Sequence, residues 1–188
     1  MSRCLSMLCV LLLAGCGHKA PAPVDRPPPA PASTDFSRLT SAIAAIQPGE
    51  VILYEGLPSQ FWEPQQRETE LRQSQTIELH GYPFYEELLP LQKSDAEQLT
   101  ALFTAPGSFQ TYSANKKCSE FHVDYGLEWN SAEGKTAAFV SLECGEVEIF
   151  GPKGSLRCDF SDAAAQTIKQ LLKHHSNNRP EPDDGKSS

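Results

Sequence analysis

Hydrophobic residues follow two different spacings along this chain, and the spacing changes near its middle. Helical spacing in the first half predicts helices over 35–46, 64–71 and 94–103. The first helix begins at Asp35, a residue that caps helices well. The third begins at Ser94, and Glu97 follows it at the distance typical of a capping box. Short apolar runs between the helices predict strands over 51–54 and 76–80, and the aromatic segment 81–85 is expected to be a loop.

Alternation of apolar and polar residues dominates the second half of the chain. It predicts strands over 109–113, 121–129, 136–142, 147–150 and 155–160. On one face of the 121–129 strand we expect its five apolar residues, Phe121, Val123, Tyr125, Leu127 and Trp129. Short turns separate the last four strands, which favours an antiparallel meander. A final helix, capped by Ser161 or Asp162, carries Ile168 and Leu172 on its apolar face.

These elements predict a single α+β domain over residues 35–175, an antiparallel β-meander with packed helices. That length suits one domain with one core. Hydrophobic residues make up 39% of the chain and charged residues 21%, which is ordinary for a folded domain. The segment 176–188 is polar and contains proline, so we expect a disordered tail.

The N-terminal residues have the features of a secretion signal. The positive charge of Arg3 precedes an apolar run from Cys4 to Ala14, and this run is shorter than the roughly 17–25 residues that span a bilayer. The residues Leu13-Ala14-Gly15-Cys16 resemble the lipobox of bacterial lipoproteins. This resemblance implies a signal peptide over 1–15 and acyl chains on Cys16 that anchor the protein in a membrane. Because Gly17 and not aspartate follows, it also implies the outer membrane, with the domain facing the periplasm.

Proline and alanine dominate residues 16–34, between the lipobox and the predicted domain. Proline fixes the backbone and removes a hydrogen-bond donor, so this segment is expected to be an extended tether. The net charge of the chain is −8. Such an acidic protein is repelled by nucleic acid and by anionic lipid surfaces, so the acyl chains must supply the membrane attachment.

Three cysteines lie in the predicted domain, namely Cys118, Cys144 and Cys158. A secreted destination permits disulfides, and the odd number leaves at least one thiol without a partner in the domain. A turn near residues 132–133 would place His122 roughly opposite Cys144, and Cys118 would share the face of His122. The spacing therefore predicts a Cys118–Cys144 or a Cys144–Cys158 disulfide, without deciding between them.

The same residues permit two chemical alternatives. Cys118, His122 and Cys144 could bind zinc or copper, although their spacing matches no common zinc motif. A cysteine could also act as a nucleophile beside His122, with Asp124 orienting the imidazole. The remaining interpretation is a solvated polar face with small buried thiols. No other feature indicates a cofactor, and we favour a binding or scaffolding role over catalysis.

Aromatic side chains cluster in two segments of the first half and suggest a ligand groove. Phe61 and Trp62 form one pair, and Tyr82, Phe84 and Tyr85 lie in the other segment. Aromatic side chains offer a large contact area at a small entropic cost, which suits a groove for sugar or peptide. Packing in the core is the alternative role for Trp62, Tyr82, Phe84 and Tyr85. The sequence does not identify the partner, whether it is a protein or another envelope component.

Several short motifs also resemble a family of small bacterial proteins, many of them lipoproteins, that has no assigned activity. The matching residues are Tyr54–Pro58, Gly81–Tyr85, Lys117-Cys118, Phe121-His122, Asp124-Tyr125, Glu128-Trp129, Cys144–Glu146 and Phe150–Pro152. This resemblance covers most of the domain and implies that it is one unit. Ser119-Glu120 and Val123 stand where those relatives carry Gly-Gly and Pro.

Overall fold

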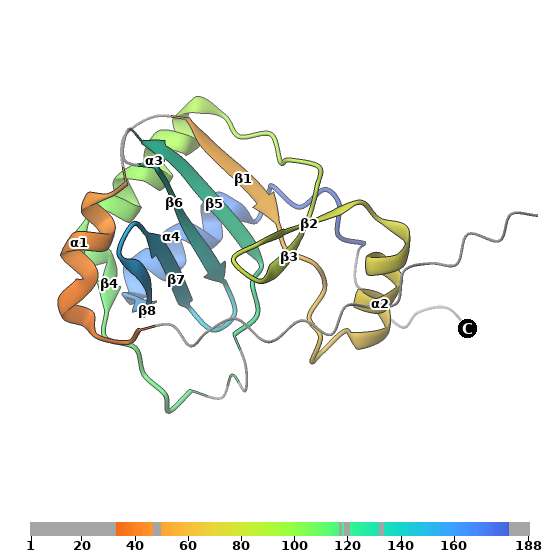
Figure 1. Cartoon of the computed structure of the whole chain (residues 1–188), viewed down its shortest axis with the longest axis horizontal. Coiled ribbons are helices and arrows are strands. Elements are labelled where there is room, and N and C mark those ends of the chain that lie inside the picture. The colour runs from red at the N-terminus through yellow and green to blue at the C-terminus, as the bar shows by residue number, and fades with distance from the viewer. Residues whose placement is uncertain (1–32, 47–49, 117, 119–120, 132–133, 181–188) are drawn as a thin grey trace, which may run out of the picture.

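A computed structural model of the chain describes residues 33–46, 50–116, 118, 121–131 and 134–180 (Figure 1). The predicted signal peptide over 1–15, Cys16 and nearly all of the tether lie outside these residues. The helices are η1 (Phe36–Arg38), α1 (Leu39–Ala44), α2 (Pro64–Gln73), α3 (Lys93–Thr104), η2 (Pro106–Ser108) and α4 (Asp162–Leu172). The strands are β1 (Val51–Glu55), β2 (Thr76–Leu79), β3 (Tyr82–Tyr85), β4 (Phe109–Gln110), β5 (Tyr125–Ser131), β6 (Gly134–Ser141), β7 (Glu146–Gly151) and β8 (Gly154–Phe160).

Six of the strands form one antiparallel sheet in the order β1-β5-β6-β7-β8-β4, and β2 and β3 form a separate hairpin. Strands β5 to β8 are consecutive neighbours in the sheet, which confirms the predicted meander and the α+β class. Tight turns join them, such as the one that pairs Gly151 with Gly154. The two sheets and four α-helices make a single α+β domain.

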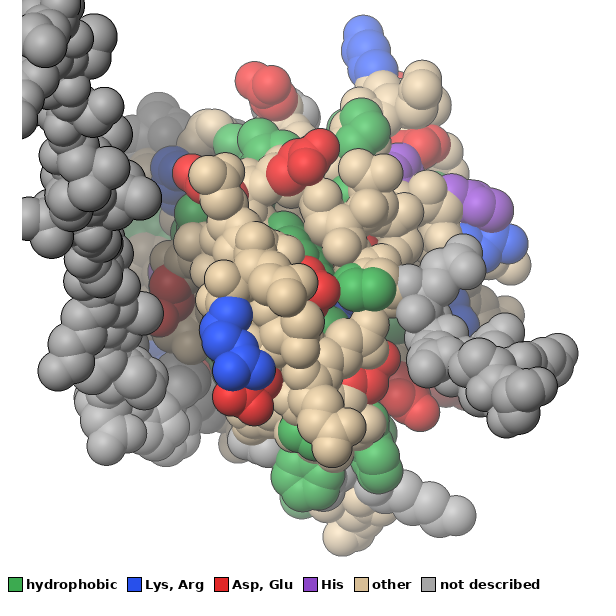
Figure 2. Space-filling model, turned by 90° about the vertical axis from the view of Figure 1, so that its right-hand side faces the viewer, with side chains coloured by type: hydrophobic (Ala, Val, Ile, Leu, Met, Phe, Trp, Pro, Cys, Tyr) green, Lys and Arg blue, Asp and Glu red, His purple; other side chains and the backbone are tan. Residues whose placement is uncertain are grey.

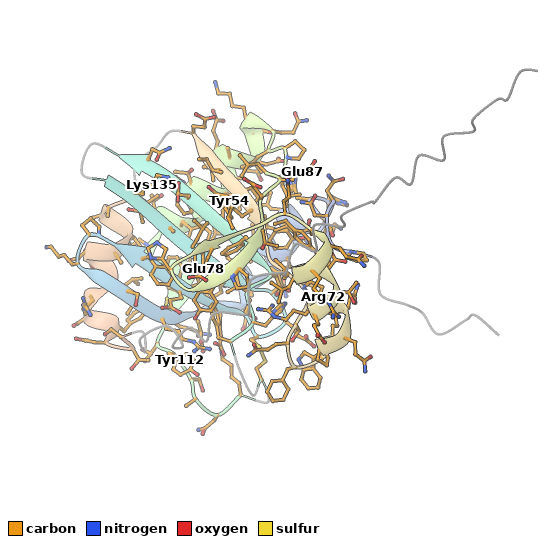
Figure 3. All side chains as sticks on the ribbon, turned by 45° about the vertical axis from the view of Figure 1, so that its right-hand side comes forward. Tyr54, Arg72, Glu78, Glu87, Tyr112 and Lys135 are labelled. Carbon is orange, nitrogen blue, oxygen red and sulfur yellow. A yellow bond between two sulfur atoms is a disulfide. The ribbon has the colours of Figure 1, made fainter. Side chains whose placement is uncertain are left out.

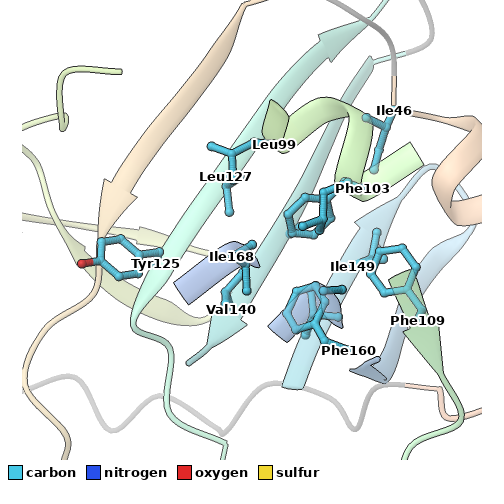
Figure 4. Packing of buried hydrophobic residues seen from close by; sticks show 14 of the residues in the cluster. Ile46, Leu99, Phe103, Phe109, Tyr125, Leu127, Val140, Ile149, Phe160 and Ile168 are labelled. Carbon is cyan, nitrogen blue, oxygen red and sulfur yellow. The ribbon is translucent and has the colours of Figure 1, made fainter. Parts of the chain in front are cut away.

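One face of the large sheet is covered by α1, α3 and α4 (Figure 1). Leu99 and Phe103 of α3 and Ile168 of α4 pack against Leu127 and other buried residues of the strands (Figure 4). Trp129 is fully buried here, and its Nε1 donates a hydrogen bond of 3.0 Å to the Thr100 hydroxyl. This face holds the main core of the domain.

The opposite face of the sheet is covered by the β2–β3 hairpin. Phe84 of the hairpin packs edge-on against Phe139 of β6, with ring centroids 4.9 Å apart. A two-residue turn at His80 and Gly81 joins the two strands, and both residues have positive φ, of 50° and 88°. Such a turn matches the twist of antiparallel strands. This tight turn lets β3 begin at Tyr82, so the prediction of a loop over 81–85 was wrong.

Other predictions differ from the structure in their boundaries; β4, for example, covers only Phe109–Gln110 of the strand predicted over 109–113. Strand β5 begins at Tyr125 and not at Phe121, so Phe121 and Val123 join the cluster under the hairpin while Tyr125 faces the main core. Alternation cannot show that the chain bends between these positions. Helix α3 begins at Lys93, and the Ser94 hydroxyl bonds the neighbouring Asp95 carboxylate in place of a capping box. The cap at Asp35 is confirmed, since its Oδ1 accepts from Ser37 N at 3.1 Å.

Candidate functional site

A cavity of about 380 Å³ opens between the hairpin turn, the segments 57–62 and 121–123, and side chains from α2 and β8. We call it the aromatic groove. Its lining residues in the described part of the chain are Leu57, Ser59, Gln60, Phe61, Trp62, Arg67, Gly81, Tyr82, Pro83, Phe121, His122, Val123 and Arg157. The predicted groove residues divide in two. Trp62 and Tyr82 line the cavity, whereas Phe84 and Tyr85 are buried.

The rim of the aromatic groove is a turn held by Ser59. The Ser59 Oγ accepts hydrogen bonds from the backbone N–H groups of Phe61 and Trp62, at 3.2 and 3.3 Å. The Glu63 carboxylate in turn accepts from Ser59 N at 3.1 Å. Phe61 and Trp62 are nevertheless 54% and 69% exposed. Hydrophobic side chains are visible at the lower edge of the face that carries α2 (Figure 2). The turn thus holds two large apolar rings in solvent at the mouth of the cavity.

The floor of the groove is fixed by Tyr82. Its hydroxyl donates to Glu148 Oε2 at 3.1 Å, and its ring meets Phe121 and Phe139 edge-on. Burial raises the pKa of Glu148 above its ordinary value, although the Tyr82 hydroxyl opposes this. Contacts with both its ring and its hydroxyl therefore fix the orientation of Tyr82.

Arg157 forms the wall that belongs to the large sheet. Its guanidinium carbon lies 4.4 Å from the centre of the Phe121 ring and 5.1 Å from that of Tyr112. Its Nε also donates to the buried Glu146 carboxylate at 3.0 Å. Lys116 completes the network with ion pairs to Glu146 and Asp159. Figure 3 shows Tyr112 at the end of the sheet where this network lies. Cation–π contacts and ion pairs together hold the arginine in place.

A second cavity of about 410 Å³ adjoins the first and shares Ser59, Trp62 and His122 with it. His122 Nε2 lies 3.4 Å from Asp124 Oδ1, and Arg179 Nη1 lies 3.3 Å from the same oxygen. Leu142 N donates to the other carboxylate oxygen at 2.8 Å. Burial alone would raise the pKa of Asp124, but His122, Arg179 and Leu142 outweigh it and hold this pKa below its ordinary value.

The C-terminal segment supplies Arg179 and corrects a sequence prediction. We expected disorder from Ser176 onward, but residues 176–179 bind the end of β1. The carboxylate of Glu55 accepts from Ser176 Oγ at 2.7 Å, Asn177 N at 3.2 Å and Asn178 N at 2.6 Å. Arg179 Nη2 donates to Gly56 O at 2.8 Å. The polar segment is held by the buried Glu55 carboxylate and the Gly56 carbonyl. Composition alone cannot show that such partners exist.

Cys118 and Cys144 form a disulfide, with their Cα atoms 5.9 Å apart. This confirms one of the two predicted pairings, and Cys158 is free and buried. Burial raises the pKa of the Cys158 thiol to about 12, so it is a thiol at neutral pH. The proposed metal and nucleophile alternatives require Cys118 or Cys144 as a thiolate, and in the structure their sulfurs are bonded to each other. Within the described residues, no group of three or more His, Cys, Asp or Glu could hold a metal ion.

Removing the disulfide should destabilise the domain. The bridge closes a loop over 26 positions, which predicts a stabilisation of about 3 kcal/mol through the unfolded state. We expect the double replacement of Cys118 and Cys144 by serine to lower the free energy of unfolding by that amount in urea. Reductant should lower the stability of the wild type similarly and leave the double variant unchanged. An unchanged wild-type midpoint under reductant would contradict the prediction.

Asp124 should make stability depend on acid pH. Its pKa is lowered in the fold from the ordinary value of 3.8, so its ionised form stabilises the fold above that pH. This contribution is lost as the pH falls through the lowered pKa. We expect Asp124→Asn to reduce the free energy of unfolding by about 1–3 kcal/mol near neutral pH. The difference between the two proteins should shrink steadily below about pH 4. A difference that stays constant down to about pH 2 would refute this assignment.

The sequence indicated Trp62, Tyr82 and His122, but it missed Ser59, Arg67 and Arg157. Ser59 and Glu63 are four positions apart, one more than in a capping box, so this pattern did not indicate the rim. Arg157 alternates with the buried residues of its strand, but only the fold brings it beside Phe121.

None of the described helices combines the length and apolar character needed to cross a membrane. No family model, curated protein or solved structure matches this chain.

Proposed function

We propose that this protein is a lipoprotein of the cell envelope whose domain binds a ligand in the aromatic groove and does not act as a catalyst. The acyl chains on Cys16 would anchor it in the outer membrane, and the domain would face the periplasm. The observation that carries the binding role is the Ser59 turn, which holds Phe61 and Trp62 exposed beside a cavity. Exposed rings at a concave site are typical of ligand recognition.

The ionisable groups around the aromatic groove support binding over catalysis. Each is engaged with a neighbour: Tyr82 with Glu148, Arg157 with Glu146, and His122 with Asp124. Such pairs fix the positions of side chains, as binding requires. The disulfide likewise ties Cys118 to the turn between β6 and β7. A preformed cavity loses little entropy when it takes up a ligand.

The beginning of the described chain fits a tethered domain. Ser33 O accepts a hydrogen bond of 2.7 Å from Arg157 N, so the chain meets the domain at the β8 edge of the sheet. The Pro- and Ala-rich segment before it, residues 16–32, would reach about 50 Å if it is extended at ~3.1 Å per residue. Two or more acyl chains would be needed to hold the protein stably, since one chain binds a membrane only marginally.

Anchoring is tested by replacing the lipobox cysteine. We expect Cys16→Ser to move the protein from the membrane fraction to the soluble fraction after cell lysis, because the acyl chains have no attachment site. Cys9→Ser is the matched control, since it changes a cysteine outside the lipobox and should leave the protein on the membrane. Retention of the Cys16→Ser protein on the membrane would disprove the lipid anchor.

Binding in the groove is tested by the fluorescence of Trp62. The chain has two tryptophans, and Trp129 is fully buried, so quenching by acrylamide reports on Trp62. We expect a small-molecule extract of the envelope to protect Trp62 from acrylamide. Tyr82→Ala should abolish this protection, whereas Leu88→Ala, an exposed residue outside the groove, should not. Protection that persists in Tyr82→Ala, or no protection at all, would contradict a binding role for the groove.

A further inference from the structure

We infer that Phe61 and Trp62 dock the domain on the surface of the bilayer that holds its anchor. We call these two residues the aromatic tip. The inference rests on the proposed lipid anchor and adds a contact that anchoring alone does not require. Its grounds are the exposure of the two rings, the small area that they present, the charges around them and the place where the described chain begins.

The aromatic tip presents apolar rings to solvent from a fixed backbone. Phe61 and Trp62 are the two most exposed large hydrophobic residues of the described chain, at 54% and 69%. Their ring centroids lie 5.9 Å apart, so they form one patch. The Ser59 turn holds the backbone of both residues, and docking must therefore order little more than two side chains. Tryptophan suits a membrane surface, because its ring is apolar and its N–H can bond to headgroups.

The aromatic tip is too small to be a stable protein interface by itself. A phenylalanine or tryptophan side chain buries about 150–250 Å² when it is covered, so the exposed parts of the two rings offer roughly 250 Å². A stable protein interface needs about 800 Å² from each partner. A weak contact is sufficient at the bilayer, because the proposed tether keeps the domain within about 50 Å of it and gives a high effective concentration.

The charges around the aromatic tip make no demand for anionic lipid. Two cavities adjoin Trp62, and their described lining includes Glu63 and Glu143 besides three arginines. Each of these arginines is bonded to a carbonyl or carboxylate of the protein, namely Arg67 to Pro58, Arg157 to Glu146 and Arg179 to Asp124. The whole chain carries −8. Burial of the rings, and not attraction between charges, must therefore hold the tip on a membrane.

The described chain begins beside the groove that the aromatic tip borders. Ser33 O accepts a hydrogen bond of 2.7 Å from Arg157 N, and the side chain of Arg157 lines the aromatic groove together with Trp62. In Figure 1, η1 and the segment between β1 and α2 both reach the lower side of the domain. The proposed anchor thus holds the domain from the side on which the tip lies. With the tip docked, the groove opens toward the bilayer and takes its ligand at the lipid surface.

The test measures how close Trp62 comes to the acyl chains of a bilayer. The protein is purified as the cell makes it and is incorporated into phosphatidylcholine vesicles whose acyl chains carry bromine, which quenches nearby tryptophan. Trp129 is fully buried, so the quenching reports on Trp62. We expect stronger quenching by bromine near the headgroups than by bromine at the chain ends. Neither added anionic lipid nor high salt should change it, because the contact is apolar.

Variants separate the aromatic tip from the groove. Phe61→Ala should lower the ratio of docked to free domains about tenfold, because it removes one of the two rings. Leu88→Ala is the matched control, since Leu88 is 50% exposed but lies outside the tip. Tyr82→Ala alters the floor of the groove and should leave the quenching unchanged. Trp62→Phe should abolish the quenching and so confirm the reporter, and thermal unfolding of each variant checks that the fold is kept.

Three outcomes would overturn the inference. Unquenched Trp62 in protein bound to vesicles would show that the domain does not touch the bilayer, while the proposed anchor and groove would stand. Loss of quenching in Tyr82→Ala would mean that a lipid held in the groove causes it. Shielding of Trp62 from acrylamide that grows with protein concentration, without vesicles, would assign the tip to a second copy of the chain. Protein that binds no vesicles at all would reject the lipid anchor as well.

Discussion

Replacing Gly56 by alanine is expected to destabilise the domain by about 4 kcal/mol or more, enough to prevent stable folding. A Cβ atom at this position would lie 2.0 Å from Val123 O and 3.2 Å from Asp124 O. Both are backbone atoms, so no side-chain rotation relieves the overlap. Gly56 N also donates a hydrogen bond of 2.9 Å to Asp124 O, which holds the two segments at this close distance.

The measurement is urea unfolding of Gly56→Ala beside a matched control. Gly107→Ala is that control, because a Cβ there meets no atom within 4 Å. We expect the control to stay within about 0.5 kcal/mol of the wild type. The clash should also disturb the aromatic groove, because Val123 and Leu57 line the groove on either side of this contact. A Gly56→Ala protein as stable as Gly107→Ala would show that the contact is looser than the structure has it.

Gly56 illustrates which features a single sequence can predict. The strand before it was predicted over 51–54 from its apolar run, and that pattern says nothing of why glycine stands at position 56. The need for glycine comes from the approach of Val123, which lies 67 positions away and belongs to no strand. Local pattern therefore predicted most of the elements and the meander, although not β3, because helical and strand periodicity are local. Close approach between distant segments is a property of the assembled fold.

The candidate site likewise combines features that local sequence patterns predict with contacts that only the assembled fold creates. Hydrophobicity singled out Tyr82 and Phe84, but it could not say that one lines a cavity and the other fills the core. Both side chains lie on the face of β3 that meets the sheet and both contact Phe139, but Tyr82 lies next to the hairpin turn, where the cavity opens. The disulfide was predictable as one of two pairings, since parity placed Cys118 and His122 near the Cys144 turn. The ion pair of Arg157 with Glu146 and its cation–π contact with Tyr112 were not predictable, because both partners come from other segments of the chain.

The second large effect is expected from removing residues 176–188. This truncation would leave the carboxylate of Glu55, which is 1% exposed, without its hydrogen bonds from Ser176, Asn177 and Asn178. It would also remove Arg179 from Asp124. A buried charge that loses its partners costs about 3–5 kcal/mol. We expect a loss of that size in the free energy of unfolding, measured in urea.

Two matched chains show whether Glu55 causes the loss. Removing only residues 181–188 keeps every hydrogen bond to Glu55 and should leave stability within about 0.5 kcal/mol of the full chain. In the chain truncated after His175, Glu55→Leu should recover part of the lost stability, because it removes the unpaired charge that the truncation creates. The same replacement in the full chain should be destabilising, since it leaves two backbone N–H groups without their acceptor. Additive effects of truncation and Glu55→Leu would mean that the segment acts elsewhere, because two changes that share one interaction cannot be independent.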